Sequence, residues 1–192
     1  MVGSARSSLL PALVLACLAT PALAQTRAAL ADARADFAPT PAAFAHVPSH
    51  HDLADSVLVV KSERKLYLLK AGKVLREFNI ALGLQPKGPK RREGDFRTPE
   101  GRYLLENRNP ASDYFLAIQV SYPNAGDRAR ALAEGVDPGG AIMIHGQPNH
   151  PRGDERSYQG WDWTDGCIAV SNSDMIEIWL MTTDSTPIEI RP

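Results

Sequence analysis

Between residues 57 and 122, short runs of β-branched, aliphatic and aromatic residues alternate with turn residues. Two of these runs, Leu66–Leu69 and Val74–Ala81, are separated by Ala71-Gly72, which is typical of a tight hairpin turn. Segments of this length cannot bury an apolar face alone and must pair with neighbours in a sheet. The spacing therefore predicts a mainly β domain with a largely antiparallel sheet.

The same pattern predicts the remaining elements. Strands are expected at Val57–Val60, Leu66–Leu69, Val74–Ala81, Gly101–Leu105, Tyr114–Tyr122, Ile142–Ile144 and Pro187–Arg191. Short helices are expected at Arg128–Glu134 and Asp174–Thr182, the second capped by Ser171, Asn172 or Ser173. No repeat or second domain boundary is evident, and residues 55–192 are expected to form one domain.

The start of the chain has the features of an export signal. Arg6 precedes the apolar run Leu9–Ala19, and Ala22-Leu23-Ala24 forms an A-x-A cleavage pattern. Residues 1–24 are therefore predicted to be a signal peptide, which places the mature protein in the periplasm or cell envelope. The run is shorter than the roughly 20 apolar residues of a transmembrane helix. Cleavage before Cys17 would instead give a lipid anchor, but Leu15 fits that pattern poorly.

Residues 25–54 are rich in Ala and Pro and are interpreted as a linker. Pro39, Pro41 and Pro48 interrupt any long helix there. The formal net charge of -1 and the sequence pI of about 6.5 give no indication of binding to nucleic acid or to an anionic membrane.

Removal of the signal peptide would leave Cys167 as the only cysteine, in a compartment where paired cysteines oxidise. A lone cysteine is either a small buried residue or a reactive thiol. Cys167 follows Gly166, and the backbone N–H groups of Asp165, Gly166 and Cys167 could converge on an oxyanion. His145, at the end of the strand Ile142–Ile144, is the expected base, with His150 as the alternative.

Four motifs support one another by their order in the chain. They are Lys61-Ser62-Glu63-Arg64-Lys65-Leu66, then 94–103 with Thr98-Pro99-Glu100-Gly101-Arg102-Tyr103, then Ile144-His145-Gly146, and Thr164-Asp165-Gly166-Cys167. Together they resemble the L,D-transpeptidase catalytic domain, or YkuD type, from about Asp55 to Arg191. The resemblance implies a bent sheet or sandwich with one or two short helices and a cleft that holds Cys167 and His145.

This chain departs from the family pattern at three places. Asp165 stands where most relatives carry a second histidine, and its negative charge would raise the pKa of the thiol. Ala169 stands where many relatives have an arginine or asparagine that contacts substrate. The loop 147–163 is slightly long. A substrate contact is therefore expected to have moved elsewhere.

Candidate substrate contacts lie around these motifs. Lys90 and Arg92, with Lys87 and Arg91, are cations that could bind a stem carboxylate or could simply be solvated. Trp163, with Tyr158 and Trp161, could form a wall against sugar or peptide or could be packing residues. Gly146 and Thr164 adjoin the expected base and nucleophile.

The resemblance implies that Cys167 attacks the diaminopimelate carbonyl of a tetrapeptide stem and releases D-alanine. The thioester then passes to an amine of another stem or of an envelope protein, with no cofactor or metal. A hydrolase of the same fold is the nearest alternative. A zinc peptidase using His145, His150, Asp165 and Cys167, and a non-catalytic wall-binding domain, are alternatives of other classes.

Overall fold

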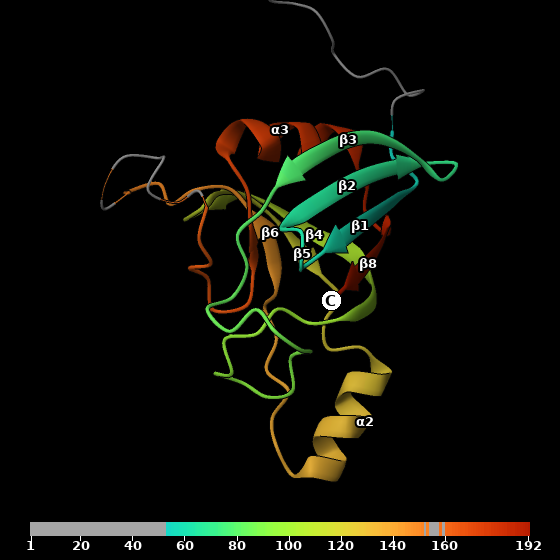
Figure 1. Ribbon diagram of the computed structural model, residues 1–192, viewed down its shortest axis with the longest axis vertical. Helices are drawn as coiled ribbons and strands as arrows, with labels where there is room; N and C mark the ends of the chain where they lie inside the picture. The colour runs from blue at the N-terminus through green and yellow to red at the C-terminus, as the bar shows by residue number, and fades with distance from the viewer. Residues whose placement is uncertain (1–52, 152, 154–157, 159) are drawn as a thin grey trace, which may run out of the picture. The chain divides into compact units, whose positions relative to one another are not determined.

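The structure is a computed structural model that describes residues 53–151, 153, 158 and 160–192 (Figure 1). The predicted signal peptide and all but two residues of the predicted linker lie outside the described residues. The strands, in chain order, are β1 Ser56–Val60, β2 Lys65–Lys70, β3 Lys73–Asn79, β4 Gly101–Ser112, β5 Phe115–Val120, β6 Met143–His145, β7 Ile168–Ala169 and β8 Pro187–Arg191. The helices are α2 Ala125–Glu134 and α3 Asn172–Met181.

These strands form one sheet in the order β3-β2-β1-β8-β4-β5-β6-β7. Antiparallel pairing predominates, as predicted, and the parallel pairs are β1 with β8 and β6 with β7. β8 lies between β1 and β4, so a strand from the end of the chain completes the middle of the sheet. Alternation in sequence could not reveal this partner because it specifies faces and not neighbours.

The sheet bends until its two ends meet. Beyond β3, Ala81 exchanges backbone hydrogen bonds of 2.8 and 2.9 Å with Ala169 of β7. Gly83 bridges Thr164 a few residues further on. The predicted strand Val74–Ala81 is therefore cut short at Asn79, because the chain leaves β2 at this point and turns to β7.

The core lies inside this bend. Val59, Leu66 and Leu68 are fully buried and alternate with more exposed residues, as expected for strands with one face inward. Met175 and Ile178 of α3 join the same apolar cluster, so α3 covers one side of the core (Figure 1). Each buried side chain of this size contributes about 2 kcal/mol through loss of water contact.

Both helices begin at a polar cap. Asn124 and Asp127 form a capping box that starts α2 three residues before the predicted Arg128. Ser171 accepts from the Asp174 backbone N–H at the start of α3, as expected for one of the three candidate caps. No helix among the described residues has the length and apolar character needed to cross a membrane.

Ala54 belongs to the folded region although it was assigned to the linker. Its side chain is 7% exposed, and its backbone N–H donates to the carbonyl oxygen of Met181 at 2.8 Å. β4 also continues to Ser112, beyond the predicted end at Leu105. The polar residues of its second half concealed that extension because they lack the apolar alternation of a half-buried strand.

Candidate active site

The parallel register of β6 and β7 brings the two predicted catalytic residues together. His145 pairs with Ala169 and Ile144 pairs with Ile168, so one step back sets Cys167 opposite Met143. Alternate residues of paired strands share a face, which places His145, Met143 and Cys167 on the same side. All three line one cavity of about 290 Å³.

Cys167 can be reached from solvent at this cavity. Its sulfur lies 3.6 Å from the Ala141 carbonyl oxygen, and the residue is partly exposed. Ala117, which pairs with His145 across β5 and β6, forms part of the lining. The thiol is therefore accessible to a substrate, in contrast to the alternative of a cysteine sealed in the core.

His145 is held as a neutral base. Its side chain is 4% exposed, and Nδ1 lies 2.7 Å from the Gly146 carbonyl oxygen. A neutral ring donates to that oxygen through Nδ1–H and leaves the Nε2 lone pair to accept a proton. Burial lowers the pKa of His145 to about 4, whereas the bond to Gly146 acts in the opposite direction. The ring is thus unprotonated near neutral pH.

Aromatic rings enclose the imidazole. The Tyr114 ring centroid lies 4.6 Å from that of His145, and Trp163 meets His145 edge-on at 5.7 Å. The Trp163 ring in turn contacts the Tyr158 ring, and its indole N–H donates to the Tyr158 carbonyl oxygen at 3.2 Å. Tyr114 was not singled out from the sequence, because one aromatic beside a hairpin turn carries no distinctive signal.

The thiol is mostly protonated in this setting. Burial raises the pKa of Cys167, and the charge of Asp165 raises it further, as the sequence predicts for this departure. A backbone hydrogen bond at Met143 and the charge of Lys90 act in the opposite direction. Attack by sulfur consequently requires a base to remove the proton, and His145 lines the same cavity.

A closed turn presents Cys167 to the cavity. Gly166 has a φ of 134°, and a Cβ there would lie 2.7 Å from the Arg97 carbonyl oxygen. The hydroxyl of Thr164 accepts from the Gly166 N–H at 3.2 Å and donates to the Cys167 carbonyl oxygen at 2.8 Å. Thr164 therefore stabilises the turn, and it also lines the cavity, so its expected role in binding substrate stays a prediction. Among the three expected oxyanion donors, Gly166 already has an acceptor in the turn.

Gly146 also has a packing role. A Cβ at this position would lie 2.5 Å from Asn172 Oδ1 and 3.0 Å from Phe115 Cβ. Its backbone N–H is shared between the carbonyl oxygens of Tyr114 and Leu116. Glycine is required here because β5 and α3 approach so closely. The expected contact of Gly146 with substrate stays a prediction.

Lys90 is held within the fold by polar contacts, unlike the free cation considered for this position. Its side chain is 4% exposed, and Nζ donates to Asp95 at 2.8 Å and to the Arg92 carbonyl oxygen at 3.2 Å. Arg130 of α2 donates to the Lys90 carbonyl oxygen, so this hydrogen bond joins the loop to the helix. Lys90 is already paired and cannot offer a free cation to a stem carboxylate.

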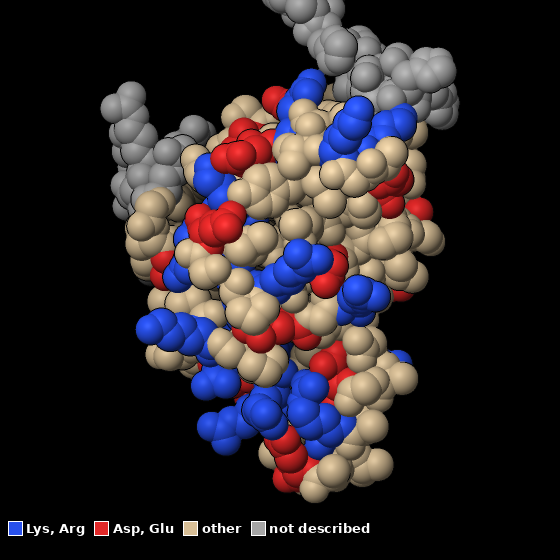
Figure 2. Space-filling model, turned by 45° about the vertical axis from the view of Figure 1, so that its right-hand side comes forward, with Lys and Arg blue, Asp and Glu red and all other residues tan. Residues whose placement is uncertain are grey.

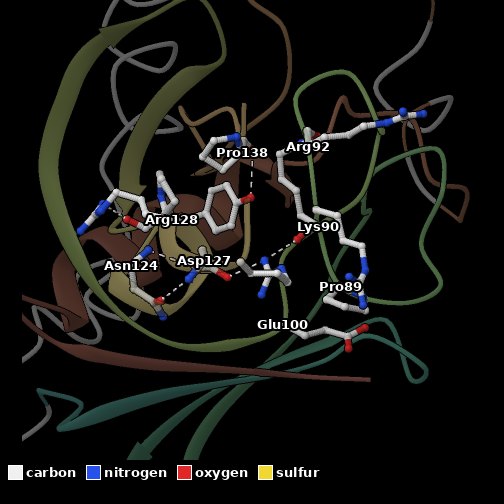
Figure 3. Close-up of polar contacts among 12 residues, drawn as sticks. Pro89, Lys90, Arg92, Glu100, Asn124, Asp127, Arg128 and Pro138 are labelled. Carbon is white, nitrogen blue, oxygen red and sulfur yellow. Dashed lines mark hydrogen bonds and ion pairs between the residues drawn. The ribbon is translucent and has the colours of Figure 1, made fainter. Parts of the chain in front are cut away.

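Arg92 is exposed, and its side chain extends away from Lys90 (Figure 3). Arg91 pairs with Glu134 of α2 at 2.5 Å. Lys and Arg side chains gather on this lower part of the molecule, around α2 (Figure 2). The loop 85–97 is thus basic, and Arg92 is the member of the predicted pair that could still meet an anionic substrate.

Two alternatives from the sequence concern His150 as the base and a zinc site. His150 is exposed and does not line the cavity of Cys167, so the geometry favours His145 as the base. Within the described part of the chain, no three His, Cys, Asp or Glu side chains form a group suited to a metal ion.

Fold and site together define a class: a bent, mainly antiparallel β domain with a thiol and a neutral imidazole at one cavity. The family model of the YkuD L,D-transpeptidase catalytic domain matches residues 54–190. The chain belongs to this family.

Similar proteins agree with that membership. The chain is 32% identical over 133 residues to YafK of Escherichia coli (strain K12), named as a candidate L,D-transpeptidase, covering 66% of this chain and 46% of YafK. Pgp2 of Campylobacter jejuni, a helical cell shape determining protein, is 30% identical with a TM-score of 0.51, and the match covers 70% of this chain and 46% of Pgp2. Bd1075 of Bdellovibrio bacteriovorus shares the fold at 24% identity and a TM-score of 0.50, covering 74% and 49%. This chain spans less than half the length of each.

Proposed function

We propose that this protein is a periplasmic L,D-transpeptidase that uses Cys167 to cleave the diaminopimelate–D-alanine bond of a peptidoglycan tetrapeptide stem. The observation that carries the proposal is that Cys167 and His145 line one accessible cavity. A thiol and a base at one surface are the requirement for covalent acyl transfer.

The steps follow from the protonation states. His145 Nε2 takes the thiol proton while the sulfur bonds to the diaminopimelate carbonyl carbon. The backbone N–H groups of Asp165 and Cys167 stabilise the oxyanion. The imidazolium then returns its proton to the departing D-alanine amine, which leaves a thioester on Cys167. An amine from another stem or from an envelope protein attacks the thioester, and the thiol is regenerated.

The dimensions of the cavity suit the end of a stem. A volume of about 290 Å³ is at the lower limit for a ligand pocket. It can therefore hold the terminal residues of one peptide while the rest extends over the surface. The export signal expected in residues 1–24 supports a periplasmic location, where this substrate is found.

Intact-mass measurement of the protein with purified tetrapeptide muropeptides tests the proposal. We expect a thioester adduct with loss of D-alanine, and a cross-linked dimer when an amine acceptor is supplied. Cys167→Ala should give neither product. D-alanine release without dimer at any acceptor concentration would assign a hydrolase instead. Binding without any adduct would support the wall-binding alternative and overturn both.

A further inference from the structure

A second cavity, of about 760 Å³, adjoins the active site and is more than twice as large as the cavity of Cys167. Its walls come from the β1–β2 turn, the end of β3, the loop before Thr164, and the ends of β6 and β7 with the start of α3. Its volume is within the range of small-molecule binding sites, about 300–1,000 Å³.

The two cavities are neighbours. Ala169 and Gln147 line the second cavity. Ala169 lies in β7, two positions after Cys167, and Gln147 lies just beyond β6, two positions after His145. Two strand residues span about 7 Å. Trp163 lines the first cavity and packs on Tyr158 of the second, so this aromatic pair lies between the cavities. A ligand in the second cavity could therefore belong to the molecule that reacts at Cys167.

The lining combines an aromatic surface with uncharged polar groups. Trp161 is 53% exposed and lines the cavity, and Asn79 and Ser62 add an amide and a hydroxyl to the lining, the hydroxyl also donating to the Pro192 carbonyl oxygen. Gln147 is 4% exposed, and among the described residues its Oε1 has no hydrogen-bond partner, although Nε2 donates to the Val170 carbonyl oxygen. These groups match a ligand with one apolar face and several hydroxyl or amide groups.

The charges disfavour an anionic ligand. Arg64 donates to Asp162 through Nε at 3.0 Å and through Nη2 at 2.7 Å, so the guanidinium is neutralised within the wall. With Arg64 and Asp162 balancing each other, the carboxylate of Asp174 gives the cavity lining a net negative charge. A carboxylate or phosphate would be repelled here, whereas a neutral sugar would not.

The small side chain at position 169 keeps the cavity open. Ala169 is 2% exposed and lines the cavity. A longer side chain would occupy part of the volume and bring its own polar head into it. The small Ala169 side chain therefore leaves this volume available to a ligand.

From this combination we infer that the second cavity is a binding site for a neutral N-acetylated saccharide, with the sugar ring stacked on Trp161 and its acetamido or hydroxyl groups bonded to Asn79 and Gln147. In catalysis, the site would hold the glycan that carries the stem. That use rests on the proposed function, whereas the binding itself does not.

The probe is N,N′,N″-triacetylchitotriose, which has no peptide, and the readout is calorimetric or NMR titration of the full chain carrying Cys167→Ala. We expect saturable binding that weakens about tenfold in Trp161→Ala and measurably in Asn79→Ala. Phe96→Ala removes an exposed aromatic that does not line the cavity, and it should bind as before.

Absence of saturable binding, or equal affinity in Trp161→Ala and Phe96→Ala, would overturn the saccharide site. Stem cleavage measured separately on protein with Cys167 intact distinguishes the two proposals. Cleavage without saccharide binding rejects only this inference, and saccharide binding without cleavage rejects only the transpeptidase.

Discussion

Nδ1 of His145 lies 2.7 Å from the carbonyl oxygen of Gly146, the residue that directly follows it. A backbone acceptor thus determines which ring nitrogen carries the proton, without any acidic side chain. The opposite nitrogen is free to act as the base. Since the backbone position is fixed by packing of Gly146 against Asn172 and Phe115, the orientation of the base depends on the fold itself.

The pH dependence of acylation should reflect this buried base. Because burial lowers the pKa of His145 to about 4, it stays neutral at pH values where an ordinary histidine is protonated. The acid limb of acylation by tetrapeptide muropeptide, followed by intact mass, should therefore lie near pH 4. A limb near 6.5 would show that the ring is solvated.

The same histidine should make stability depend on pH. Between pH 6.5 and about 4, the unfolded chain binds the proton and the folded chain does not. Stability should therefore fall as pH decreases through this window, by up to about 3 kcal/mol. Urea unfolding across the window measures the slope, and His145→Gln should flatten it because that side chain does not titrate.

Trp163→Ala should admit water to the imidazole. Its ring contacts His145 edge-on, so its removal reduces the desolvation that lowers the histidine pKa. The acid limb of acylation should move up by about one pH unit. Trp161→Ala is the matched control because that ring lines the other cavity, and its acid limb should not move.

Gly166→Ala should damage the turn beneath the nucleophile. The new Cβ would lie 2.7 Å from the Arg97 carbonyl oxygen at a φ of 134°, which side chains rarely adopt. A loss of about 2–4 kcal/mol in unfolding free energy is expected. Gly140→Ala, where a Cβ has nothing within 4 Å, should change stability by less than about 1 kcal/mol.

Lys61 and Lys65 should respond differently to replacement by methionine. Lys61 is 2% exposed and donates to Glu100 and to the carbonyl oxygens of Gly88 and Thr98. Its loss should cost about 3 kcal/mol because Glu100 and both carbonyls lose a buried partner. Lys65 pairs with Glu77 at the surface, and its loss should cost less than about 1 kcal/mol. Similar values in chemical denaturation would contradict this distinction.

The sequence predicted the hairpins and the two helices because these depend on neighbours in the chain. Turn residues such as Ala71 and Gly72, and a cap such as Ser171, act over a few positions. The position of β8 between β1 and β4, and the closure at Ala81 and Ala169, depend on long-range pairing that periodicity does not encode.

In the candidate site, too, the local features were predictable from the sequence and the long-range contacts were not. Cys167 and His145 were recognisable from flanking residues, but their common cavity depends on the two-residue register of β6 and β7. Lys90 was a candidate either for binding a stem carboxylate or for exposure to solvent, and the sequence could not show that Asp95 pairs with it within the fold. Tyr114 and Gln147 carried no signal because their importance arises only from what folds around them.

The central place of β8 also determines when this domain can form. β8 is the last of the eight described strands to be synthesised, yet β1 and β4 have no shared neighbour without it. A growing polypeptide would therefore carry a split sheet until residue 191 is free to enter it. The half of the sheet that contains β6 and β7 should consequently join the half that contains β1, β2 and β3 into one bent sheet only when β8 has paired with both β1 and β4.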